Sequence, residues 1–138
     1  MSLNLWRLSL PLAYMAALYA LSSIPGDQAP DTWAGTLFMW VEPQWQNLLH
    51  VPLYGGLTAS WLWAMGTWPL SRNGLLIISL LLAATWGLLD EIHQANVPGR
   101  YGSITDMLLN ICGAILAVSY AGLRHLPTGK PDATAGEL

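Results

Sequence analysis

Long apolar runs separated by short polar stretches make up most of the chain. A helix needs about 20 consecutive apolar residues to cross the hydrocarbon core of a bilayer. The runs therefore predict an all-α membrane protein, a bundle of four transmembrane helices. The predicted spans cover residues 3–24, 47–68, 74–95 and 103–123. The first run also fits a signal peptide, but it exceeds the roughly 7–15-residue apolar core of such a peptide, so we expect it to be retained.

The segment between the first two runs, residues 25–46, is rich in tryptophan and has no Lys or Arg. It fits either a short interfacial helix in the headgroup layer, begun by Asp31 as N-cap, or an irregular loop with its aromatic side chains at the interface. Residues 127–138 are rich in Pro, Gly and Thr, and we expect a disordered tail there. Residues 1–126 would then form one membrane domain.

The low content of charged residues supports a membrane environment. Charged residues make up 9% of the chain, against about 25% in soluble domains. No Lys/Arg cluster indicates nucleic acid as a partner. Cys112 is the single cysteine, which excludes an intrachain disulfide.

The basic residues predict the orientation of the helices. Arg7, Arg72, Arg124 and Lys130 lie at the termini or between the second and third spans, and Arg100 lies in a loop of the other face. Short loops rich in Lys and Arg stay in the cytoplasm. We therefore expect both termini in the cytoplasm and the loops around residues 25–46 and 96–102 outside.

This topology brings polar residues of three spans to one level near the outer interface. His50 begins the second span, Asp90 and Gln94 end the third, and Asp106 and Asn110 begin the fourth. Ionisable groups inside apolar segments are costly, so they indicate a site. Asp90 and Gln94, four residues apart, share a helix side. Asp106 and Asn110 lie on one side of the fourth span. Further along the span this side carries small residues, which favour close contact with another helix.

Two acids and a histidine are the candidate catalytic residues. Adjacent acids such as Asp90 and Glu91 point in different directions on a helix, so we expect one to face the pocket and the other the headgroups. His50 would be the partner of Glu91 in acid–base chemistry. The alternative is a polar cluster that fastens three helix ends and needs no substrate.

Arg100, Asp106, Asn110 and Gln94 are the candidate ligand-binding residues. Arg100 would hold a phosphate or carboxylate with its planar fork, or else tie its loop to the bundle through nearby acids. Asp106 would face the ligand, or else cap the helix begun at Ser103. Asn110, one turn deeper, would contact the ligand or form a hydrogen bond between helices.

We expect no metal and no cofactor. His50, His93 and Glu91 are a conceivable metal-binding set, but no HExxH or Cys–His spacing is present, and His93 lies off the face of Asp90 and Gln94. Nucleophile-elbow, phosphate-loop and dinucleotide-binding motifs are also missing from the sequence.

Several of these motifs together resemble the VanZ-like family of small bacterial membrane proteins. The resemblance rests on DEIHQANVPGR at 90–100 and SITDMLLNICGAILA at 103–117, with SSIPG at 22–26 and NLLH at 47–50. Family members often carry an Asp-Lys pair where this chain has Gln46-Asn47, and Gly where it has Ala117.

The resemblance implies a four-helix protein of the bacterial cytoplasmic membrane, linked through the founding member to teicoplanin resistance. We consider two functions. The first is a cell-envelope protein that binds a lipid or lipid-linked glycan through an outer-leaflet polar pocket, or modulates glycopeptide susceptibility. The second is a membrane-embedded enzyme acting on a lipid-linked or phosphate-bearing substrate. Proton-coupled transport is weaker, because four short helices make a thin pathway unless a homo-oligomer forms.

Overall fold

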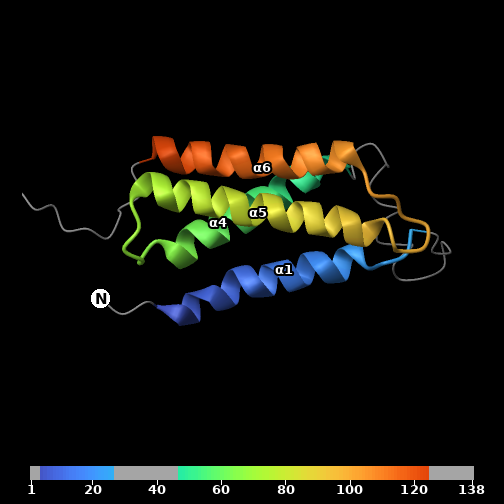
Figure 1. Ribbon diagram of the computed structural model, residues 1–138, viewed down its shortest axis with the longest axis horizontal. Coiled ribbons are helices and arrows are strands. Elements are labelled where there is room, and N and C mark those ends of the chain that lie inside the picture. Colours follow the sequence, from blue (N-terminus) through green and yellow to red (C-terminus); the bar gives the residue numbers. More distant parts are fainter. Residues whose placement is uncertain (1–3, 27–46, 125–138) are drawn as a thin grey trace, which may run out of the picture.

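All regular structure in the described part of the chain is helical. The computed structural model describes residues 4–26 and 47–124. Its elements are the 3₁₀ helix η1 (Leu5–Leu8) and the α-helices α1 (Ser9–Ser22), α4 (His50–Met65), α5 (Arg72–Gln94) and α6 (Ile104–Leu123). The α-helices lie side by side along one axis, each reversing the direction of the one before (Figure 1). The predicted all-α bundle is confirmed, whereas the interfacial helix and the tail lie outside the described residues.

Two of these helices, α5 and α6, are long and apolar enough to cross a membrane. By contrast, α4 has 16 residues, or about 24 Å of helix at about 1.5 Å per residue. That is shorter than the roughly 30 Å hydrocarbon core. The first helix also differs from the single span expected from residue 3, because the 3₁₀ turn η1 precedes α1.

Proline and serine residues explain where the helices begin. Pro11 and Pro52 lie in the first turns of α1 and α4, where backbone N–H groups have no helical acceptor and proline loses nothing. Ser71 and Ser103 are extended N-caps of α5 and α6, and their hydroxyl oxygens accept from the N–H groups three residues later, at 3.1 and 3.2 Å. The expected N-cap at Ser103 is confirmed.

The closest helix pair, α4 and α6, meets at glycine. A Cβ atom on Gly113 would lie 3.0 Å from both Cα and the carbonyl carbon of Val51, and closer still to the Val51 oxygen. A Cβ on Gly55 would lie 3.4 Å from the Gly113 oxygen. Only a missing side chain permits this approach, so the expected close contact at the small residues of the last helix is confirmed.

Large apolar side chains cover the outside of the bundle. On α5 and α6 the exposed ones include Ile77, Leu81, Leu88, Ile92, Leu108, Ile115 and Leu116. An apolar perimeter of this extent is unusual for a protein in water. It fits a chain whose surrounding solvent is lipid.

Arginines mark one end of the bundle. Arg7 donates to the carbonyl of Trp63 at 3.3 Å, Arg72 donates to the carbonyl of Gly122, and Arg124 lies 5.1 Å from the Tyr120 ring. The first and last described helices start and finish at this end (Figure 1). The other end carries the polar residues of the candidate site.

Candidate functional site

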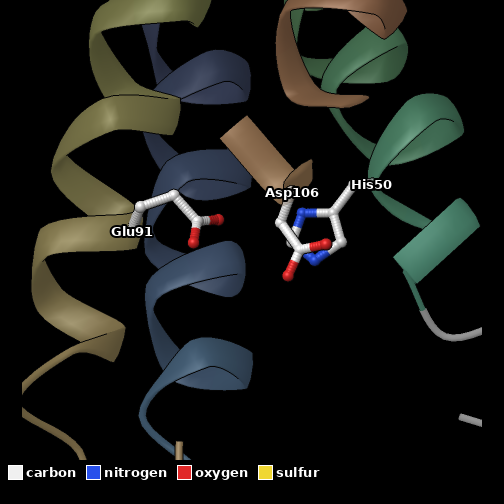
Figure 2. A group of neighbouring side chains, drawn as sticks. All are labelled: His50, Glu91 and Asp106. Atoms are coloured by element: carbon white, nitrogen blue, oxygen red, sulfur yellow. The ribbon is translucent and has the colours of Figure 1, made fainter. Parts of the chain in front are cut away.

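A histidine and two carboxylates from three helices meet at the end of the bundle away from these arginines. His50 is the first residue of α4, Glu91 lies in the last turn of α5, and Asp106 lies in the first turn of α6. One ligand atom from each of the three lies within 4.8 Å of those from the other two. Figure 2 shows the Glu91 carboxylate pointing across the bundle toward Asp106 and His50. The predicted convergence of the three helix ends is present.

Asn110 joins the histidine to the acid. It is fully buried on α6, with 0% of its surface exposed. Its Oδ1 lies 2.7 Å from His50 Nδ1, and its Nδ2 donates to Glu91 Oε1 over a long 3.5 Å. A carboxylate can only accept, so the Asn110 amide turns its NH₂ toward Glu91 and its oxygen toward the imidazole. His50 therefore donates from Nδ1 to the Asn110 oxygen.

Glu91 also accepts a hydrogen bond from the backbone N–H of Ser103, which donates to Oε2 at 2.9 Å. In a capping box, the carboxylate of Asp106 would accept this N–H. Glu91 from α5 caps the start of α6 instead. Asp106 Oδ1 is buried and has no hydrogen-bond partner within residues 4–26 and 47–124.

Asp90 belongs to a second buried group beside the first. Tyr54 Oη and Gln94 Nε2 both donate to Asp90 Oδ2, each at 3.2 Å. The expected shared side of Asp90 and Gln94 is confirmed. The expectation that one of the adjacent acids faces the headgroups is wrong, because Asp90 and Glu91 are each only 6% exposed. Each carboxylate accepts a hydrogen bond from another part of the bundle, Asp90 from Tyr54 and Glu91 from Ser103, which offsets the cost of burial.

Arg100 ties the α5–α6 loop to the end of α1. Its guanidinium donates to the Ile24 carbonyl at 2.7 Å, to Gln94 Oε1 at 3.3 Å and to the Leu21 carbonyl at 3.4 Å. Partial burial lowers the pKa of Arg100 from its usual value, and the nearby carboxylates of Asp90 and Glu91 raise it. A guanidinium stays charged under such opposing effects, so these contacts match the loop-tying interpretation.

The sequence around Arg100 explains how the loop reaches α1. Pro98 and Gly99 occupy the centre of a turn closed by the Arg100 N–H and the Val97 carbonyl at 3.1 Å, and Gly99 has φ 69°. This is the pattern of a type II turn, which favours Pro followed by Gly. The Gly26 N–H donates to the Pro98 carbonyl at 3.0 Å. The SSIPG and PGR motifs thus contact each other in the folded chain.

His93 lies apart from the cluster of His50, Glu91 and Asp106. Its Nε2 is 2.9 Å from the Ser23 hydroxyl, and its ring centroid is 4.4 Å from that of Tyr19 on α1. The set of His50, His93 and Glu91 considered from the sequence is therefore not brought together. Among the described residues, the group able to hold a metal ion contains Asp106 in place of His93.

Two groups at the site were not predicted from the sequence. Tyr54, 1% exposed, lies one helical turn after His50, and the two rings are stacked with centroids 6.3 Å apart. That spacing of four residues could have indicated it. The Ser103 backbone N–H carries no sequence signal, because every residue except proline has one.

These features define a class of protein, a small helical membrane protein with a buried polar cluster at one end of an apolar bundle. The VanZ/LLP1 family model matches residues 4–124. The chain therefore belongs to the VanZ/LLP1 family, and the resemblance seen in its motifs is confirmed. Neither the curated proteins nor the solved structures gave a match.

Proposed function

We propose that this VanZ/LLP1 protein binds the polar head of a lipid or lipid-linked glycan at the outer leaflet and thereby lowers susceptibility to teicoplanin-type glycopeptides. The cluster of His50, Glu91, Asp106 and Asn110 carries the proposal, because it is polar, lies between helices and stands at one end of an apolar bundle. His50 and Asp106 are partly exposed. A ligand arriving from the headgroup layer would meet them first, while Glu91 and Asn110 would hold them in place.

A phenotype assay tests this function. The full chain is expressed in a teicoplanin-susceptible bacterium, and the minimal inhibitory concentration of teicoplanin is measured. We expect expression to raise that concentration and His50→Ala to return it to the level of the empty vector, since the substitution removes a polar group of the cluster. His93→Ala is the matched control and should keep the phenotype, because His93 contacts Ser23 and Tyr19 instead. Equal phenotypes for the two histidine variants would argue against the cluster as the binding site.

The alternative function is an enzyme that converts a phosphate-bearing lipid. It is favoured by one observation, the closeness of the His50 imidazole to the Glu91 and Asp106 carboxylates, an arrangement suited to proton transfer. In the same strains, chromatography of extracted lipids separates the two functions. Unchanged lipid in a resistant strain supports binding, whereas a new lipid species that requires His50 supports the enzyme.

The proposal also includes a topology, with four spans, both termini in the cytoplasm and the cluster outside. The clustering of Arg7, Arg72 and Arg124 at the opposite end supports it. α1 and α4 are short, so the bilayer would have to thin around them or η1 and the residues before His50 would have to complete their spans.

Cysteine labelling checks this topology. The native cysteine is first removed by Cys112→Ser, since Cys112 is an exposed free thiol. Tyr101, 86% exposed, and Asn73, also exposed, are then replaced singly by cysteine. A membrane-impermeant maleimide applied to intact cells should label Tyr101→Cys and leave Asn73→Cys unlabelled until the cells are lysed. The reverse pattern would invert the orientation and place the cluster in the cytoplasmic leaflet.

A further inference from the structure

We propose that His50, Glu91 and Asp106 form a binding site for a divalent transition-metal ion such as Zn²⁺ or Mn²⁺. The three side chains come from α4, α5 and α6, and one ligand atom of each lies within 4.8 Å of the others (Figure 2). Ligand atoms around one ion with bonds of about 2.0–2.2 Å are roughly 3–4 Å apart. Small rotations of the two carboxylate side chains would close that difference without moving a helix.

The histidine ring is held as it is in many metal sites. Metal-bound imidazoles usually donate the remaining ring N–H to an oxygen, which fixes the ring and the tautomer. Here the Asn110 Oδ1 accepts from His50 Nδ1 at 2.7 Å. In a neutral imidazole held this way, Nε2 would be the ligand atom.

The carboxylates are oriented in the same way. Glu91 is 6% exposed and receives the Ser103 N–H on Oε2 and the Asn110 Nδ2–H on Oε1. Each oxygen of a carboxylate accepts more than one contact, so coordination is compatible with these bonds. Asp106 Oδ1 is buried without a hydrogen-bond partner in the described ranges, and an ion would satisfy it.

The charges of the cluster favour a divalent cation. In their ionised forms, Glu91 and Asp106 together carry two negative charges. Like charges held close together in a poorly hydrated site are costly. A bound ion of charge +2 would neutralise the pair directly.

The types of ligand narrow the choice of ion. One imidazole nitrogen and two carboxylates suit Zn²⁺ and Mn²⁺ better than Ca²⁺ or Mg²⁺, which prefer oxygen alone. Three protein ligands leave a coordination position open, as in sites that bind water or substrate. That position would accept a phosphate oxygen of the lipid head, a step that rests on the proposed function, whereas the ion site itself does not.

Metal titration of the purified full chain tests the site without any added lipid substrate. The protein is stripped with EDTA in detergent and titrated with Zn²⁺ by calorimetry and with Mn²⁺ by electron paramagnetic resonance. We expect saturable binding of one ion per chain, weakened by about tenfold or more in Asp106→Asn and in His50→Ala. Asp106 is partly exposed, so Asp106→Asn keeps the shape of the site if His50→Ala fails to fold.

The other two histidines provide the controls. His93→Ala and His125→Ala should bind the ion as the wild-type chain does. No saturable binding, or equal binding by Asp106→Asn and the wild type, would overturn the metal site. A bound ion in a chain that leaves teicoplanin susceptibility unchanged would instead overturn the proposed function alone.

Discussion

Gly113→Ala is expected to destabilise the bundle strongly although it adds a single methyl group. The new Cβ would lie 3.0 Å from two backbone atoms of Val51 and closer still to its carbonyl oxygen. Backbone atoms cannot turn aside as a side chain can, so α4 and α6 would have to separate. Overpacking of this kind costs about 1–3 kcal/mol, and we expect the upper end of that range. The midpoint of thermal unfolding in detergent, followed by circular dichroism, measures it.

Gly122→Ala, on the same helix, is the matched control. A Cβ there would meet only Leu76 Cδ1, at an ordinary 3.8 Å. Alanine is a better helix former than glycine by about 1 kcal/mol, so this variant should unfold at the same temperature as the wild type or higher. Similar losses in the two variants would mean that the α4–α6 contact is not what Gly113 provides.

Much of the architecture could be predicted because it depends on local sequence. Apolar runs predicted the helices, and Ser103 predicted the start of one of them. The spacing of Asp90 and Gln94 predicted that they share a helix side. These three predictions are confirmed. Each of these depends on residues within about one turn of each other, where helical geometry fixes the neighbours. Successive helices run in opposite directions, and this alone predicts that the polar residues of the cluster lie at the same end of the bundle.

The rotation of each helix could not be predicted in the same way. Along α1 and α4 apolar residues continue all the way round, so no polar face indicates which side turns inward. Without a known rotation for α4, the sequence could not show which side chains of α5 and α6 lie beside His50. Asp106 joins it where His93 does not, and Asp90 and Glu91 are both buried. A metal set drawn from three helices also has no local spacing for a motif to capture.

The contacts of Arg100 depend on the loop that carries it. The Arg100 guanidinium reaches the Leu21 and Ile24 carbonyls at the end of α1. Backbone carbonyls at a helix end are present in any sequence, so no motif indicates them as partners of Arg100. The PGR and SSIPG motifs were both noted in the sequence. They lie far apart along the chain, so the sequence did not indicate that they contact each other.

Asn110→Leu is expected to have the second large effect, because it removes the group on which His50 and Glu91 both depend. Leucine has a similar size, so the change removes hydrogen bonds rather than volume. The His50 Nδ1–H and the Glu91 Oε1 would lose their contacts at 2.7 and 3.5 Å within the bundle. A buried polar group left without a partner costs about 1–3 kcal/mol. The free energy of unfolding in detergent should fall by about that amount.

The same substitution at Asn96 separates this effect from a general response to leucine. Asn96 is exposed, and its amide donates only to the Ile92 carbonyl one turn back, at 2.7 Å. Asn96→Leu should change the free energy of unfolding by no more than about 0.5 kcal/mol, as surface changes usually do. Asn110→Leu should in addition weaken Zn²⁺ binding by about 10–100-fold, the usual loss when a residue that orients a metal ligand is removed. If Asn110→Leu proved as stable as Asn96→Leu, Asn110 would not be the residue that holds the histidine and the acid together.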